Sequence, residues 1–123
     1  MKTRYTVALS MIAGVALGAT AIQGLHAQAK KVYFISQSEV VDPAAVEGWN
    51  KTVRPIITKF GGNLMISDKV IAVLGTAPKR VGVTEFPSVE KAQAWADSKE
   101  RADLEPQRNK AIKLTNQYIV EVQ

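Results

Sequence analysis

The chain has 123 residues and a formal net charge of +5, which allows a single, mildly basic domain. It contains no cysteine, and its Lys and Arg residues are spread among acidic residues instead of forming a block. These features exclude a disulfide-stabilised scaffold and give no indication of nucleic-acid binding.

The N-terminus has the pattern of a secretory signal peptide over residues 1–29. Two cations precede an apolar run from Val7 to Ile22, and small residues ending in Ala27-Gln28-Ala29 follow it. We expect cleavage after Ala29, or alternatively after Ala27, which leaves a mature domain of residues 30–123. An uncleaved membrane anchor is the other alternative, but the run is short for stable spanning. The sequence therefore predicts an exported protein, periplasmic or extracellular, without stable membrane insertion after cleavage.

A strand and an amphipathic helix open the mature domain. Residues 31–40 alternate in the manner of a strand, with Val32 and Phe34 on one face. Asp42 is suited to cap a helix that continues to residue 60, and Pro55 predicts a kink within it. The apolar face of this helix consists of Val46, Trp49, Val53, Ile56, Ile57 and Phe60.

The middle of the chain predicts a hairpin and a further strand. Residues 63–67 and 70–75 are short apolar runs, and Asp68-Lys69 between them has the length of a tight turn. We therefore expect these two runs to pair with each other. Residues 79–86 predict the next strand.

The last third predicts a helix, a broken helical stretch and a closing strand. Ser88 is suited to cap the helix, and a break follows at Ser98. Residues 102–113 predict a helical stretch interrupted near Pro106, and residues 116–123 predict the last strand. The apolar stripe of the helix consists of Val89, Ala92, Trp95 and Ala96.

This succession predicts an α+β fold of ferredoxin-like βαββαβ order, in which an antiparallel sheet carries its helices on one face. Several strands are apolar at successive residues, so both faces of the sheet require burial. The helices cover one face only. We therefore expect a homodimer in which the sheets of two copies pack together.

Four short motifs stand in a characteristic order: Asp42-Pro43, Gly61 to Asn63, Glu85 to Ser98, and Leu104 to Arg108. In this order and spacing the mature domain, nearly end to end, resembles the domain of unknown function 1330 family. The resemblance implies a ferredoxin-like domain that assembles as a dimeric α/β barrel, and it implies no defined activity.

The chain departs from that family at three places. Phe60 stands where histidine or tyrosine is frequent, and Arg101 stands where tyrosine is frequent. Ser67-Asp68-Lys69 stands where the family often has an Arg-Gly-Gly hairpin. A polar function that depends on those family residues does not carry over to this chain.

The mature domain lacks the residues of most catalytic centres. The single histidine, His26, lies in the expected signal peptide, so residues 30–123 contain neither histidine nor cysteine. This excludes a Ser-His-Asp triad, a cysteine nucleophile, a histidine-ligated haem and the usual zinc sites. The acidic residues from Asp97 to Glu105 predict a solvated helix face. We therefore expect no metal and no cofactor.

Four residues are candidates for a ligand site: Trp49, Arg54, Trp95 and Arg108. The tryptophans have the spacing of core residues, although Trp95 precedes a helix break where a cleft can open. Arg54 can bind a ligand carboxylate, or it can pair with Glu47 or another acidic residue. Arg108, an arginine position of the resembling family, can bind a ligand or a backbone carbonyl. If these residues line a cavity, we expect the sheet to form its floor, the tryptophans its walls and the arginines its polar mouth.

Two classes of function fit these residues. The first is binding of a small, partly apolar molecule, an anion if the arginines reach it, or cofactor-free monooxygenase or isomerase chemistry by analogy with dimeric α/β barrels. The second is a non-catalytic accessory or structural dimer in the cell envelope. The lack of histidine and cysteine favours the second class, whereas a cavity that receives Arg108 or Arg54 favours the first.

Overall fold

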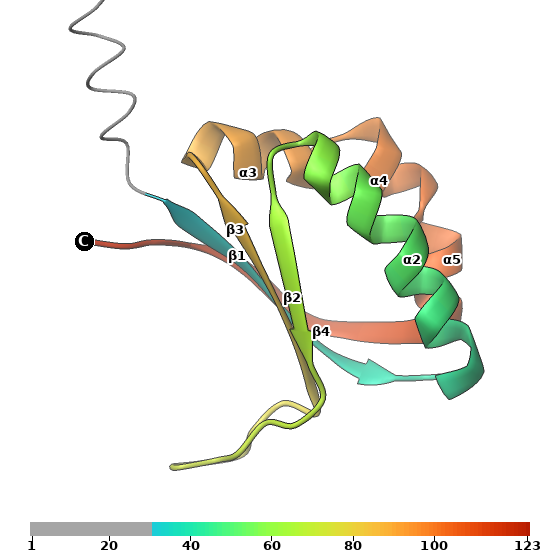
Figure 1. Ribbon diagram of the computed structural model, residues 1–123. Coiled ribbons are helices and arrows are strands. Elements are labelled where there is room, and N and C mark those ends of the chain that lie inside the picture. Colours follow the sequence, from blue (N-terminus) through green and yellow to red (C-terminus); the bar gives the residue numbers. More distant parts are fainter. Residues whose placement is uncertain (1–30) are drawn as a thin grey trace, which may run out of the picture.

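The computed structural model describes residues 31–123, which form a four-stranded antiparallel sheet with helices on one face (Figure 1). The strands are β1 (Val32–Val40), β2 (Asn63–Ser67), β3 (Arg80–Phe86) and β4 (Ile112–Glu121), in the spatial order β2-β3-β1-β4. The helices are α2 (Pro43–Lys59), α3 (Val89–Ala96), α4 (Lys99–Asp103) and α5 (Glu105–Ala111). This arrangement confirms the predicted ferredoxin-like α+β fold. The expected signal peptide lies outside the described residues.

The helices begin where the sequence predicts capping residues. Asp42 Oδ1 accepts a hydrogen bond from the backbone N of Ala44 at 3.1 Å at the start of α2. Ser88 Oγ accepts one from the backbone N of Lys91 at 3.3 Å at the start of α3. The α2 helix continues through Pro55 to Lys59, as expected. Within residues 31–123, no helix has the length and apolar character needed to cross a membrane.

The core lies between the helices and the inner face of the sheet. Val32 and Phe34 of β1 point inward, and Phe34 packs edge-on against Phe86 of β3 with ring centroids 6.5 Å apart. Trp95 of α3 packs edge-on against Phe60, with centroids 5.7 Å apart. The predicted apolar helix faces supply the remaining large buried side chains of the helical layer: Trp49, Val53 and Ile57 of α2.

The predicted hairpin between residues 63–67 and 70–75 is wrong. β2 pairs with β3 instead, with Ser67 opposite Val81. Residues 68–79 form a long connection, here called the arm, that extends to the side of the sheet opposite the helices (Figure 1). A run of β-branched residues becomes a strand only beside another strand, and residues 70–75 have no strand beside them in the described part of the chain.

The C-terminal elements differ from the prediction in their bounds. The interruption predicted near Pro106 falls at Leu104, between α4 and α5. Pro106 itself lies in the first turn of α5, where its missing N–H costs nothing. β4 begins at Ile112, four residues earlier than predicted, because its first residues pair with the end of β1. A bulge between Gln37 and Ser38 shifts the register and lets this pairing continue.

Candidate functional site

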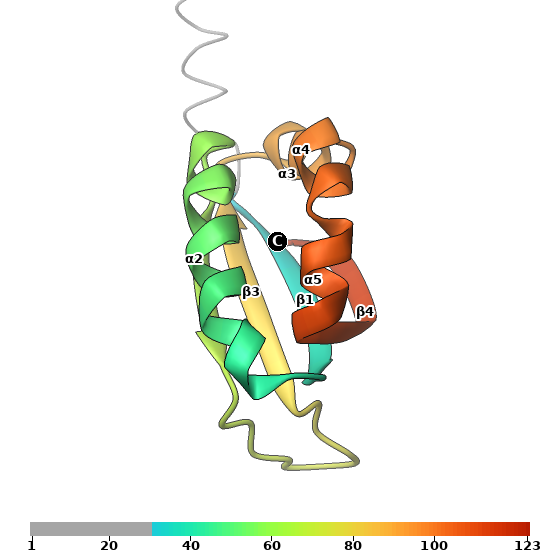
Figure 2. The same ribbon diagram turned by 90° about the vertical axis from the view of Figure 1, so that its right-hand side faces the viewer.

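A cavity of about 60 Å³ lies between the helices and the inner face of the sheet. Figure 2 shows α2 on one side of the helical layer and α4 and α5 on its other side, with the sheet behind them. Most of the cavity wall is apolar and comes from every layer of the fold: Phe34, Trp49, Val53, Ile57, Leu64 and Trp95. Its charged residues are three arginines, Arg80 of β3, Arg101 of α4 and Arg108 of α5.

Arg101 is tied to both the helical layer and the sheet. Its Nη1 donates a hydrogen bond to the carbonyl of Ala96 at 3.3 Å, and its Nη2 donates one to Oε1 of Gln117 on β4. Gln117 Nε2 in turn donates to Ser36 Oγ at 2.9 Å. Burial lowers the pKa of Arg101, and the positive charge of Arg108 lowers it further, while Glu105 and Asp97 partly oppose both effects. Because an arginine stays protonated in proteins, a half-buried positive charge faces the cavity.

Arg108 carries an unsatisfied buried donor. Its Nη2 donates to Oδ1 of the neighbouring Asn109 at 3.3 Å, but its Nε is buried and has no hydrogen-bond partner among the described residues. A buried donor without an acceptor costs about 1–3 kcal/mol. The alternative role considered from the sequence, a tether to a backbone carbonyl, is not formed within residues 31–123. Arg108 Nε is therefore available to an acceptor on a ligand.

Arg80 is the most buried of the three arginines, with 6% of its surface exposed. Its Nη2 donates to Oδ1 of Asn50 on α2 at 2.8 Å. Burial lowers the pKa of Arg80, and Asp68 at the base of the arm partly opposes this effect. Four ion pairs form in the described chain, and none of them includes Arg80, Arg101 or Arg108.

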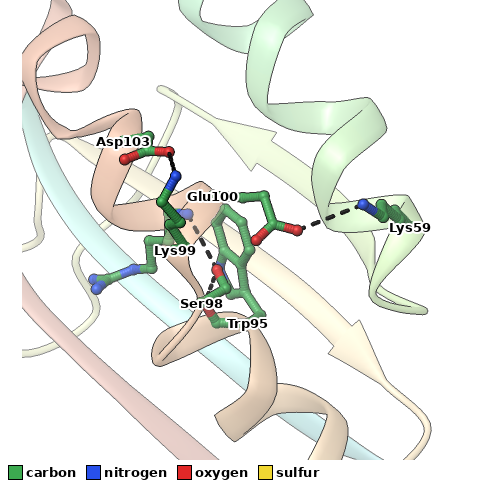
Figure 3. Close-up of polar contacts among 7 residues, drawn as sticks. Lys59, Trp95, Ser98, Lys99, Glu100 and Asp103 are labelled. Atoms are coloured by element: carbon green, nitrogen blue, oxygen red, sulfur yellow. Dashed lines mark hydrogen bonds and ion pairs between the residues drawn. The ribbon is translucent and has the colours of Figure 1, made fainter.

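Ser98 fixes the corner from which α4 presents Arg101. Its hydroxyl donates to the carbonyl of Trp95 at 2.8 Å and accepts from the backbone N of Arg101 at 3.1 Å. Figure 3 shows this corner, with Glu100 directed to Lys59 of α2 in an ion pair of 3.5 Å. The start of α4 is thus connected to both α3 and α2.

Three of the four predicted site residues, Trp49, Trp95 and Arg108, line the cavity. Arg54 does not. Its Nη1 donates to the carbonyl of Leu64, and its side chain lines a separate shallow depression along α2. The alternative role, an ion pair of Arg54 with Glu47 or another acid, is also not formed within the described chain; Glu47 pairs with Lys51 at 3.2 Å.

Arg80 and Arg101 were not predicted as site residues. For Arg80 the sequence holds a signal, since it occupies an inward position of a strand that continues inward through Gly82 and Thr84. For Arg101 the signal is weaker. It precedes Arg108 by seven residues, about two helical turns, but the break at Leu104 interrupts the helical phase between them.

The donors around the cavity suit an anion. Guanidinium groups match the planar geometry of a carboxylate, and the apolar walls can bury the rest of a small molecule. The remaining polar side chains are the hydroxyls of Ser36, Ser38 and Thr84 and the amide of Gln117. No Asp, Glu, His or Cys from residues 31–123 lines this cavity, so it offers none of the side chains that usually bind a metal ion.

Several solved structures share this fold at low sequence identity. A protein of unknown function from Rhodopseudomonas palustris has a TM-score of 0.59 and 12% identity, over 76% of this chain and 83% of its own. A dimeric ferredoxin-like protein of unknown function from Bacteroides fragilis has a TM-score of 0.55 and 10% identity, over 75% of this chain and 96% of its own. Another from Thermobifida fusca has a TM-score of 0.52 and 12% identity, over 77% and 92%.

These likenesses concern the fold alone, because all three identities are far below the level at which function is carried over. No curated protein matches the chain. The family described as domain of unknown function (DUF1330) matches residues 31–123, which is the whole described part of the sequence. The chain belongs to this family, as its motifs predicted.

Proposed function

We propose that the protein binds a small, partly apolar anion, such as a short-chain carboxylate, in the cavity between its helices and its sheet. The observation that supports this proposal is that Arg80, Arg101 and Arg108 line one cavity and that none of them forms an ion pair in the described chain. The acidic groups that act on them, Asp68 on Arg80 and Glu105 and Asp97 on Arg101, do not line the cavity. Buried positive charge without a counter-charge is unfavourable. A bound carboxylate supplies that charge and an acceptor for the free Nε of Arg108.

The size of the cavity restricts the ligand. A single water needs roughly 10–15 Å³ of such space, so about 60 Å³ accommodates a molecule of a few heavy atoms. Its apolar walls favour a short hydrocarbon chain over a strongly hydrated ion such as sulfate. With neither histidine nor cysteine in residues 30–123, the proposal is a binding function without an assigned reaction.

The second part of the proposal is that the exported, mature chain acts as a homodimer. Export rests on the signal-peptide pattern of residues 1–29. Dimerisation rests on the open face of the sheet, where an apolar row crosses all four strands in register. This row consists of Met65, Val83, Ile35 and Tyr118. Met65 and Tyr118 are 48% and 43% exposed, and two solved structures of this fold are described as dimeric.

Thermal unfolding in the presence of sodium acetate, propionate and butyrate, at matched ionic strength, tests the binding proposal. A ligand at 100 times its dissociation constant adds about 2.7 kcal/mol to stability. We expect at least one carboxylate to stabilise the wild-type chain, and we expect Arg101→Met and Arg108→Met to abolish this effect.

Arg54→Met is the matched control, because Arg54 lies on α2 outside the cavity. The control is expected to keep the ligand-induced stabilisation. Stabilisation by every anion alike, or its equal loss in all three variants, contradicts a site built from Arg101 and Arg108.

A further inference from the structure

The arm, residues 68–79, exposes a run of apolar side chains that the rest of the described chain does not cover. Ile71, Val73 and Leu74 are 87%, 98% and 96% exposed. Isolated apolar residues on a surface are normal, but a contiguous group of large ones marks an interaction site. The three side chains are therefore expected to be buried by a partner.

The direction of the arm indicates where that partner lies. The arm leaves the adjacent ends of β2 and β3 and extends to the side of the sheet opposite the helices (Figure 1). The open face of the sheet, with the apolar row through Ile35 and Val83, faces the same side. The exposed part of the arm is thus continuous with the face through which we propose that two copies pair.

The sequence of the arm also suits a protein partner. Residues 70–74, Val-Ile-Ala-Val-Leu, have the composition of a strand, yet no strand lies beside them within residues 31–123. A strand-forming segment without a neighbour typically pairs with or packs on another chain. In a two-fold dimer the contact forms twice, since each copy contributes one arm.

We propose that the arm of each subunit packs on the partner subunit in the homodimer, so that a second copy of this chain covers Ile71, Val73 and Leu74. This inference rests on the proposed homodimer and adds that pairing of the sheets alone does not complete the interface. Each arm then extends past the edge of its own sheet and packs on the other subunit. This pair of reciprocal arm contacts is called the clasp.

Sedimentation equilibrium of the mature chain tests the clasp. The triple variant Ile71→Ser, Val73→Ser, Leu74→Ser is compared with the control Val41→Ser, which changes an exposed valine next to α2. We expect the triple variant to raise the dimer dissociation constant by more than about tenfold. We expect the control to leave it unchanged and both variants to keep the far-ultraviolet circular dichroism of the wild type.

The outcomes separate the clasp from the dimer itself. A monomeric wild-type chain overturns the homodimer and the clasp together. A wild-type dimer whose triple variant dimerises equally tightly overturns the clasp and leaves the sheet dimer standing. A triple variant that dimerises as tightly as the wild type but no longer binds phosphatidylglycerol–phosphatidylethanolamine vesicles also overturns the clasp. In that case the apolar side chains of the arm contact a membrane surface instead of a second copy of the chain.

Photo-cross-linking provides a second readout that does not depend on the triple variant. The chain contains no cysteine, so Val73→Cys can be labelled uniquely with a benzophenone maleimide, with Val41→Cys as the control. In a mixture of ¹⁴N- and ¹⁵N-labelled chains, we expect the benzophenone at position 73 to form cross-links between a ¹⁴N chain and a ¹⁵N chain. Cross-links confined to the same chain overturn the proposal.

Discussion

Arg101 and Arg108 line one cavity from two successive short helices, and the pKa of Arg101 is lowered first by burial and then by the charge of Arg108. Neither of the two cations forms an ion pair in the described chain, although Glu105 and Asp97 partly oppose the lowering of the Arg101 pKa. The fold itself does not require this arrangement, since apolar side chains of similar volume would fill the same space at lower electrostatic cost. The proposed ligand of opposite charge would compensate the two like charges at this site.

The first prediction is that Arg108→Met increases the stability of the ligand-free protein. Methionine keeps much of the arginine's apolar volume, removes the unsatisfied Nε and relieves the repulsion of Arg101. We expect the free energy of unfolding to rise by about 1 kcal/mol, or the melting temperature by about 4–8 °C for a domain of this size. Urea denaturation and calorimetry measure both quantities.

Arg54→Met provides the opposite result from the same substitution. Arg54 donates to the carbonyl of Leu64, so we expect its loss to reduce the free energy of unfolding by about 1 kcal/mol. If Arg108→Met is instead the more destabilising of the two, Arg108 is a structural residue and the cavity loses its main evidence for an anion.

The second prediction concerns Trp95, which is 4% exposed and packs against Phe60 with ring centroids 5.7 Å apart. Trp95→Ala leaves a cavity beneath α3 and removes this contact, so we expect a loss of about 3–5 kcal/mol in the free energy of unfolding. Val41→Ala, at a 57% exposed position, is expected to change it by less than about 0.5 kcal/mol. A loss at Trp95 no larger than that at Val41 contradicts the packing described above.

The third prediction compares two glycines. A Cβ at Gly62 comes within 2.7 Å of side-chain carbons of both Ile57 and Thr84, whereas a Cβ at Gly48 meets nothing within 4 Å. We expect Gly62→Ala to destabilise the chain by about 1–3 kcal/mol through overpacking. Gly48→Ala, within α2, is expected to stabilise it by about 0.5–1 kcal/mol. Denaturant unfolding of both variants checks the pair, and equal effects contradict it.

The fourth prediction is a flat pH profile for carboxylate binding. Residues 30–123 contain no histidine or cysteine, and the arginines stay charged although burial lowers the pKa of Arg80 and Arg101. Binding measured by calorimetry should therefore change little between about pH 6 and pH 9 and weaken only where the ligand itself is protonated, below about pH 5. A midpoint near neutral pH indicates a titrating group that this site does not contain.

Local patterns predicted most of the fold. The alternation of Val32 and Phe34 fixed the inward face of β1, and Asp42 and Ser88 cap the helices that they were expected to cap. The arm was predicted wrongly because residues 70–75 have the composition of a strand. Composition does not show whether a strand has a neighbour in the same chain, and the pairing of β2 depends on β3, which follows the arm.

Only part of the site was predicted, because some of its residues are placed by tertiary contacts and not by local patterns. Trp49, Trp95 and Arg108 are at positions that a helical period or a family motif places near the sheet. Arg54 lies outside the cavity because its hydrogen bond to the Leu64 carbonyl directs it to the edge of the sheet. Arg101 is held at the cavity in part by a tertiary hydrogen bond to Gln117 on β4, which no local pattern records.

A crystal structure of residues 30–123 with 3-bromopropionate, recorded at the bromine absorption edge, tests most directly whether the cavity binds a carboxylate. We expect an anomalous bromine peak inside the cavity, beside Trp49 and Trp95, and a carboxylate within hydrogen-bond distance of the guanidinium groups of Arg101 and Arg108. A cavity that holds only water, with the bromine peaks confined to the molecular surface, contradicts this expectation.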